Sequence, residues 1–387
     1  MRTIICLGKG VGLMGVPRFW WLSVLTLCAG MPACSSGGGF RIGGTSQTGT
    51  PVYVTNSSSS SVSVYQINQT SGALQRTTGS PVSTGGSTPD SMVTDPGKKF
   101  LLVANSASAT ISVFTVNSST AALTPVTGSP FSTPPNAIRM VMHPSGSFVY
   151  TLSGTPGQVQ GYSFNSATGA LTPLTGFPVS LSTTGETGLA ISPNGGLLYV
   201  SNSGTNVITP FAVGPNGGLT RIQTTTSPLQ GSPFYLTFDT GGNFLFGINI
   251  GGNLGGGSVS VFSVSPLGTL TEVTGSPFPA GTTPVNAAFS QGFLYVVNQT
   301  SNTVSAFAFN ASTGQLTELR GSPFSVGARP VSAAIGVLGR FLIVTSSASS
   351  NSGSIHVFAI NADGTLTQVP GSPFAPDTPA PDQVLAF

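Results

Sequence analysis

The sequence predicts an all-β protein: a seven-bladed β-propeller of four-stranded blades, in which the C-terminal strand completes the first blade. Three observations lead to this fold class. A phrase of the form G-x-L-T recurs through the chain, each copy contains four short strand-like segments, and the two ends of the chain hold complementary parts of one copy. The leucines of the phrase are Leu74, Leu123, Leu171, Leu219, Leu270, Leu316 and Leu366.

The period of this repeat matches one propeller blade. Successive leucines are 46 to 51 residues apart, and a four-stranded blade occupies roughly 40–50 residues. In the third copy the strand-like segments are 138–143, 148–153, 159–164 and 170–175. They alternate apolar and polar residues and are rich in β-branched and aromatic side chains, which is typical of strands. No segment after the leader has a helical period.

A second phrase marks the end of each copy. TGSPF stands at 127–131 and 274–278, and variants occur at 78–82, 175–179, 230–234, 320–324 and 370–374. Proline cannot donate a hydrogen bond to a strand ladder and belongs at strand ends and edges. We therefore predict that the phrase ends the outermost strand, and that its last, apolar residue packs inward as the chain crosses to the next blade. Its role is structural.

The two ends of the repeat region predict a closed ring. The first copy begins at 51–56 with a second-strand sequence, and the chain finishes at 381–387 with a first-strand sequence. Pairing these segments removes the open sheet edge, whereas a linear solenoid would leave the last strand without a partner. The predicted innermost strands are 89–94, 137–142, 186–191, 233–238, 284–289, 330–335 and 381–386.

The amino-acid composition limits which classes of partner and which chemistry the protein can have. Hydrophobic residues make up 39% of the chain and charged residues only 5%. From residue 34 onward, nine Lys and Arg balance nine Asp and Glu. A neutral body has no basic patch for phosphates, which argues against a nucleic-acid partner. The cysteines are Cys6, Cys28 and Cys34, so the folded body has neither a disulfide nor a thiol nucleophile.

The first 34 residues are expected to be an export signal. Arg18 precedes a 12-residue apolar run, 19–30, which suits the hydrophobic region of such a signal. Met31 to Cys34 resemble a bacterial lipoprotein box with Cys34 as the lipidated residue, and 35–50 would form a flexible tether before the propeller of 51–387. Ordinary signal cleavage and an uncleaved anchor are the alternatives, and Met14 is a second possible start.

The second-strand phrases indicate a family. VYVTN (52–56), FLLVAN (100–105), LLYVSN (197–202) and FLYVVN (293–298) resemble the YVTN-type repeats of bacterial surface propellers. Together with T-G-x-L-T and G-S-P-F, they resemble the lactonase-like seven-bladed propellers, the group that contains a bacterial 6-phosphogluconolactonase. The resemblance implies the propeller fold and lactone hydrolysis. Enzymes of that family usually carry P-R-H where an inner strand begins and an acidic residue after YVxN, and neither pattern occurs here.

The predicted ligand site is the mouth of the central channel, where the inner strands begin. The aligned positions there are Asp90, Arg139, Glu186, Tyr235, Asn286, Arg329 and Asp382. Paired carboxylates beside a guanidinium suit a polar ligand, or acid–base work by a carboxylate with a shifted pKa. Solvated loop ends would also collect charges, so both interpretations stay open. His143 and His356 lack metal-ligand spacing, and neither a metal nor a cofactor is expected.

The function expected from these observations is binding at the bacterial cell envelope by an exported, lipid-anchored, monomeric propeller. Its partner would be a small polar ligand at the mouth or a surface partner, with membrane contact only through the lipid at Cys34. Lactone hydrolysis at the mouth and a purely structural surface role are the alternatives. A secreted or periplasmic location is the alternative to anchoring.

Overall fold

The computed structural model describes residues 49–387 except 182, 224–230, 253–255 and 350–351. The chain divides into two units, Met1–Thr45 and Ser46–Phe387, and all described residues belong to the second. Apart from one turn of 3-10 helix, η1 (Ser57–Ser59), the described elements are strands. The predicted signal, Cys34 and most of the tether therefore lie outside the described residues.

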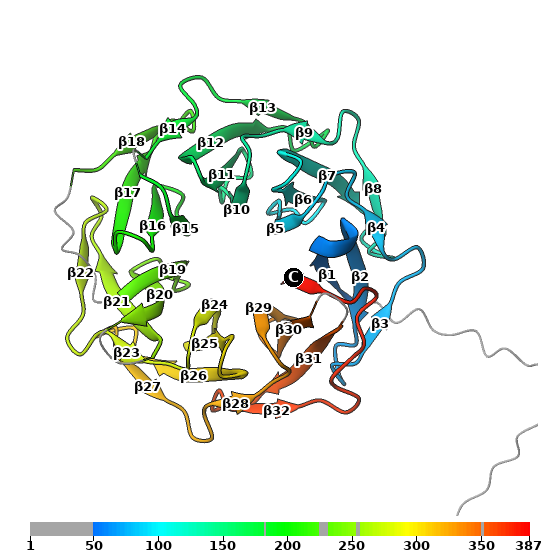
Figure 1. The fold of residues 1–387 in the computed structure, drawn as a ribbon, viewed down its shortest axis with the longest axis vertical. Helices are drawn as coiled ribbons and strands as arrows, with labels where there is room; N and C mark the ends of the chain where they lie inside the picture. Colours follow the sequence, from blue (N-terminus) through cyan, green and yellow to red (C-terminus); the bar gives the residue numbers. More distant parts are fainter. Residues whose placement is uncertain (1–48, 182, 224–230, 253–255, 350–351) are drawn as a thin grey trace, which may run out of the picture. The chain divides into compact units, whose positions relative to one another are not determined.

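The strands form seven antiparallel sheets arranged around a central axis (Figure 1). Each sheet has the same order from the axis outward, so the predicted blade is confirmed. The innermost strands are β5 (Pro89–Thr94), β10 (Ala137–Met142), β15 (Glu186–Ile191), β19 (Gly231–Phe238), β24 (Pro284–Ser290), β29 (Pro330–Gly336) and β33 (Pro381–Ala386). The second strands are β1 (Thr50–Asn56), β6 (Phe100–Asn105), β11 (Phe148–Gly154), β16 (Leu197–Asn202), β20 (Phe244–Gly252), β25 (Phe293–Asn298) and β30 (Phe341–Ser349).

The repeated leucine of the G-x-L-T phrase begins the fourth strand of each blade. The third strands are β2 (Ser61–Ile67), β7 (Thr110–Val116), β12 (Gly157–Phe164), β17 (Val207–Val213), β21 (Ser258–Val264), β26 (Thr303–Phe309) and β31 (Ser352–Ile360). The fourth strands are β3 (Leu74–Arg76), β8 (Leu123–Pro125), β13 (Leu171–Pro173), β18 (Leu219–Arg221), β22 (Leu270–Glu272), β27 (Leu316–Glu318) and β32 (Leu366–Gln368).

The C-terminal strand closes the ring, as predicted. β33 pairs antiparallel with β1, so the last and first described strands share a sheet. Val384 is 3% exposed, and the Phe387 ring lies 5.8 Å from the ring of Tyr53. Just before β33, the Asp377 carboxylate lies 3.0 Å from Nε of Arg76 on β3. Both edges of the first blade are thus held by the end of the chain.

The hydrophobic core lies between blades, and the tyrosine of the YVTN phrase connects them. One core cluster joins Tyr53 and Val64 of the first blade to Met92 and Leu101 of the next. The Tyr53 hydroxyl donates to the carbonyl of Ala121, 3.1 Å away in the neighbouring blade. Equivalent bonds run from Tyr150 to Gly217, Tyr199 to Gly268, and Tyr295 to Gly364. Blade packing therefore explains this part of the phrase.

The GSPF phrase does end the outer strand, but it also returns the chain to the third strand. After the Ser-Pro turn the chain forms two-residue strands that pair with the start of the third strand, rather than crossing directly to the next blade. These strands are β4 (Val82–Ser83), β9 (Phe131–Ser132), β14 (Val179–Ser180), β23 (Phe278–Pro279) and β28 (Phe324–Ser325). The copy at 230–234 is an exception, because Gly231–Phe234 begins the inner strand β19.

The serine of the phrase has a specific role. The Val113 amide in β7 donates to Oγ of Ser129 at 2.9 Å, and four other copies repeat this bond. In the third copy Phe177 replaces the serine, and the opposite residue is Gly161, where any Cβ would lie 2.7 Å from the Phe177 ring. The phrase therefore supplies the acceptor that an outer strand would otherwise provide.

We expect Ser129→Ala to lower the free energy of unfolding by about 1–3 kcal/mol, because it leaves the Val113 amide without its acceptor. Urea denaturation followed by circular dichroism measures the change. Ser132→Ala is the control, since that side chain is exposed two residues after the turn. Equal effects of the two substitutions would contradict the role given to Ser129.

Candidate functional site

A β-bulge near the start of every inner strand builds the mouth of the channel. In β5, Pro89 pairs with Asn105 and Ser91 with Ala104, which leaves Asp90 without a residue opposite. Each inner strand shows such a register shift. A bulge bends the strand and redirects side chains. Here two consecutive residues of each blade lie at the bulge, and most of them line the channel.

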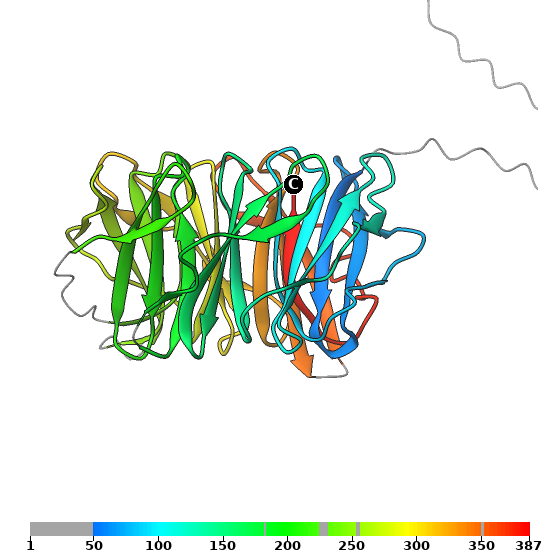
Figure 2. The same cartoon turned by 90° about the horizontal axis from the view of Figure 1, so that it is seen from above.

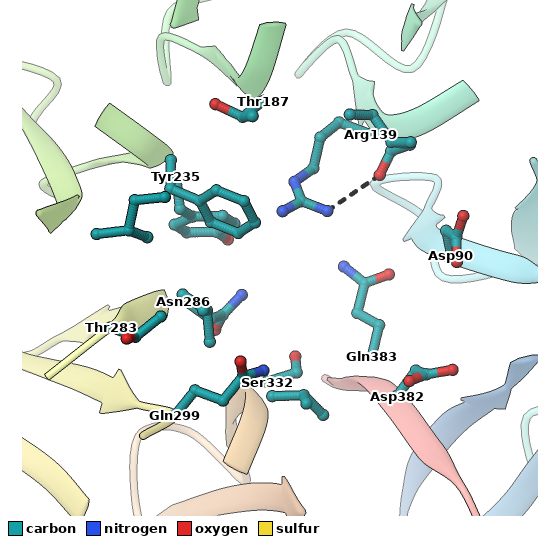
Figure 3. Close-up of a pocket in the computed structure, with 15 residues that line it drawn as sticks. Asp90, Arg139, Thr187, Tyr235, Thr283, Asn286, Gln299, Ser332, Asp382 and Gln383 are labelled. Atoms are coloured by element: carbon teal, nitrogen blue, oxygen red, sulfur yellow. Dashed lines mark hydrogen bonds between the residues drawn. The ribbon is translucent and has the colours of Figure 1, made fainter. Parts of the chain in front are cut away.

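These residues form two rings, which we call the upper and lower rings. The upper ring consists of Asp90, Ile138, Thr187, Phe234, Val285, Val331 and Asp382. The lower ring consists of the residues that follow them, Ser91, Arg139, Gly188, Tyr235, Asn286, Ser332 and Gln383. A pocket of about 420 Å³ lies at the mouth and is lined by the whole upper ring and five lower-ring residues (Figure 3).

Five of the seven residues predicted for the site line this mouth pocket: Asp90, Arg139, Tyr235, Asn286 and Asp382. The other two predicted positions are corrected. Glu186 is 3% exposed inside its blade, where Nδ2 of Asn202 donates to its carboxylate at 3.1 Å. Arg329 is exposed outside the pocket, before β29 begins. The bulge explains both errors. Because of it, the residues that line the pocket in these two blades come one or more positions after Glu186 and Arg329 in the sequence.

Arg139 is the central polar group of the pocket. Its Nη1 donates to the carbonyl of Ile138 at 3.1 Å, and its Cζ lies 5.6 Å from the ring centre of Phe234 and 5.8 Å from that of Tyr235. Its Nε is buried without a hydrogen-bond partner, and no carboxylate among the described residues forms an ion pair with it. Burial lowers the pKa of the guanidinium, while Tyr235 and Asp90 oppose that shift.

Two carboxylates from blades that neighbour each other, Asp90 and Asp382, also line the pocket (Figure 3). Burial raises the pKa of Asp90, a hydrogen bond from Ser106 lowers it, Asp382 raises it and Arg139 lowers it. Burial also raises the pKa of Asp382, and hydrogen bonds from Ser57, whose amide lies 3.1 Å from Oδ2, oppose that shift. Both groups are therefore poised to exchange protons at a higher pH than an exposed aspartate would.

Four lower-ring side chains also tie neighbouring inner strands together. Oγ of Ser91 accepts from the Met140 amide at 3.0 Å, and Oδ1 of Asn286 accepts from the Ala333 amide at 3.0 Å. In the same way Ser332 accepts from Val384 at 3.3 Å, and Gln383 accepts from Met92. These bonds run around the axis and hold the pocket floor in place.

The sequence matches the family model described as lactonase, seven-bladed beta-propeller, over residues 44–139, 139–251 and 250–380. The chain belongs to this lactonase family. No curated protein matches it. The segments matched cover almost the whole region that the structure describes.

Solved structures share the fold of this lactonase-family propeller at low sequence identity. A provisional 6-phosphogluconolactonase from Bacteroides fragilis is 19% identical, with a TM-score of 0.74 over 89% of this chain and 99% of that one. The Pseudomonas aeruginosa periplasmic gluconolactonase PpgL is 20% identical, with a TM-score of 0.71 over 87% of this chain and 99% of that one. Identities at this level support a shared fold alone.

The pocket of this lactonase-family propeller contains residues that the sequence prediction missed. They are uncharged: Thr187, Phe234, Thr283, Gln299, Ser332 and Gln383, together with aliphatic side chains. A signal for some of them was present, since the third residue of an inner strand is polar in PDS (89–91), PVN (284–286), PVS (330–332) and PDQ (381–383). No pocket-lining residue is a histidine, and the described residues contain no cluster of three or more His, Cys, Asp or Glu that would hold a metal.

His356 lies away from this pocket, within β31, and is 7% exposed. Its Nε2 accepts from the amide of Gly327 at 3.0 Å. Equivalent positions in other blades carry Ser63, Ser112 and Ser305. Burial lowers the pKa of His356 below its ordinary value of 6.5, so the imidazole is held in its neutral form.

We therefore expect stability to fall on acidification through His356. The unfolded chain binds more protons than the native one between pH 6.5 and the lowered pKa, so the stabilisation is complete above that window and is lost as pH falls, by at most about 1.4 kcal/mol per pH unit. His356→Ser should flatten this part of the profile in urea denaturation at pH 7 to 5. His143→Ser, in a turn, is the control, and an unchanged slope in His356→Ser would refute the assignment.

Proposed function

We propose that the mouth pocket binds a small hydroxylated ligand that offers a carbonyl or carboxylate oxygen to Arg139. The proposal rests on how few hydrogen bonds the Arg139 guanidinium makes within the protein. It has five N–H donors, and only the bond from Nη1 to the Ile138 carbonyl occupies one of them among the described residues. A partly buried charge with so few partners is costly, and a ligand oxygen would supply an acceptor.

The rest of the pocket defines the ligand class. Asp90 and Asp382 can accept hydrogen bonds from ligand hydroxyls, and Phe234 and Tyr235 add aromatic surface to the pocket wall. A phosphate group would meet one guanidinium and two carboxylates, an unfavourable balance for a dianion. These features favour a sugar acid, a sugar lactone or a related hydroxy acid without phosphate.

Lactone hydrolysis is the second candidate, and the lactonase family and the raised pKa of Asp90 beside Arg139 favour it. The Asp90 carboxylate would take a proton from a water molecule as the water oxygen attacks the lactone carbonyl carbon. Arg139 would stabilise the oxyanion that develops. The bond from the carbonyl carbon to the ring oxygen then breaks, and that oxygen receives the proton from Asp90, giving the open hydroxy acid.

One pair of measurements separates the two candidates. Calorimetric titration with gluconate measures binding without turnover, and acid release from D-glucono-δ-lactone measures hydrolysis. Gluconate binding without acid release above background supports a binding module. Acid release that Asp90→Asn abolishes supports a hydrolase. If neither gluconate nor the lactone interacts with the protein, the proposed function is wrong.

We also propose that the protein is exported and anchored to the bacterial cell envelope by a lipid on Cys34, as the first 34 residues predict. Among the described residues, no helix has the length and apolar character needed to cross a membrane. Metabolic labelling with palmitate and cell fractionation test the anchor. Labelled, membrane-bound protein that becomes soluble and unlabelled in Cys34→Ser supports it, whereas unlabelled soluble wild-type protein would favour ordinary signal cleavage.

A further inference from the structure

A second cavity lies along the central channel next to the mouth pocket. Its volume is about 330 Å³, and its apolar lining includes Val93, Val141, Leu189, Ala334, Ile335 and Leu385. We call it the lower chamber. An apolar cavity of roughly 150 Å³ is enough to hold a benzene molecule, so the lower chamber has room for a short hydrocarbon chain.

The two cavities adjoin at the lower ring. Arg139, Tyr235, Asn286, Ser332 and Gln383 line both the mouth pocket and the lower chamber. A ligand seated at Arg139 is therefore in contact with the side chains that form the wall of the lower chamber. No other residue group in the described part of the chain borders both spaces.

Three polar side chains of this shared ring are already hydrogen-bonded within the protein. Asn286, Ser332 and Gln383 each accept a hydrogen bond from a backbone amide of the next inner strand. Those acceptors are occupied by the protein. The next residues along the strands, such as Ala333 and Ala334, are apolar, so a hydrocarbon group would leave water and contact aliphatic side chains there.

Arg139 is held in the shared ring by few polar contacts. Its side chain makes one hydrogen bond, to the adjacent Ile138 carbonyl, and packs against two aromatic rings. No ion pair holds it among the described residues. A ligand oxygen can therefore bind the guanidinium without breaking an ion pair.

We infer that the natural ligand of this channel is amphiphilic, with a hydroxy-acid or lactone head at Arg139 in the mouth pocket and a short alkyl tail in the lower chamber. This inference rests on the proposed function and names its ligand class more closely. Sugar acids would then be weak ligands, since they fill the mouth pocket only. Alkyl hydroxy acids of matching length would bind more tightly.

The test is a calorimetric titration of the purified protein with γ-hydroxybutyrate, γ-hydroxyhexanoate, γ-hydroxyoctanoate and γ-hydroxydecanoate. These share one head group and differ only in tail length. We expect the dissociation constant to fall about fourfold for each methylene buried, and the gain to stop once the lower chamber is full. Ala334→Leu, which fills part of the chamber, should remove the gain and keep the affinity for γ-hydroxybutyrate.

The outcomes are distinguishable. Thr115→Phe, which adds an apolar side chain at an exposed position of β7, is the control and should keep the full dependence on tail length. Affinity that is independent of tail length, or binding of gluconate but of none of these compounds, would overturn the amphiphilic ligand and leave the proposed function intact. Failure of both the γ-hydroxy acids and gluconate to bind would overturn both. Tail dependence that persists in folded Ala334→Leu would mean that the tail binds elsewhere. The wild-type series decides the question even if that variant folds poorly.

Discussion

Removal of Pro381–Phe387 is expected to cost the propeller most of its stability, because it deletes the inner strand of the first blade and reopens the ring. β33 pairs with β1, and its residues contact both neighbouring blades through Ser332 and Met92.

A more local change, Val384→Asp, should lower the free energy of unfolding by about 4 kcal/mol, since it buries a charge without a partner. Urea denaturation followed by circular dichroism measures both effects.

The control for Val384→Asp is Thr124→Asp, which places the same charge at an exposed position of the outer strand β8. It should change stability by less than about 0.5 kcal/mol. If Val384→Asp were as mild as Thr124→Asp, the ring would not depend on its closing strand.

Arg139→Met is expected to have the largest effect on ligand affinity. It keeps much of the side-chain volume over Phe234 and Tyr235 but removes the guanidinium N–H donors. Hydrogen bonds to a charged group are each worth about 1.5–3 kcal/mol, so the dissociation constant for gluconate should rise by about 10- to 150-fold. Calorimetric titration measures it, and unfolding in urea checks that the fold is intact.

Arg329→Met provides the matched control, since Arg329 is an exposed arginine outside the pocket and should leave gluconate affinity unchanged. Equal losses in the two variants would point to a general charge effect. Unchanged binding in folded Arg139→Met would remove the basis of the proposed function.

The fold could be predicted from the sequence because each blade contains its own strand and turn signals. The outer strands begin at the repeated leucines, and the inner strands begin within two residues of the predicted bounds. Closure was predictable for the same reason, since a segment with first-strand character at 381–387 had only one vacant place to occupy. Regular alternation and turn residues are short-range properties, and they suffice when a fold is repetitive.

Only part of the mouth-pocket lining could be predicted from the sequence. The prediction looked for polar residues where inner strands begin, and five of them line the mouth pocket: Asp90, Arg139, Tyr235, Asn286 and Asp382. The bulge that turns side chains toward the axis is a backbone feature with no residue signature of its own, so Glu186 and Arg329 were misplaced. Phe234 and Gln383 were missed because uncharged residues gave no electrostatic reason to single them out.

The two rings at the bulges have an evolutionary consequence. Each blade contributes one residue to each ring, and those residues lie at the start of a strand whose remainder packs in the core. Substitutions in the upper ring can accumulate one blade at a time, since each changes a single part of the pocket wall. Related propellers can therefore diverge in ligand choice while their architecture stays the same.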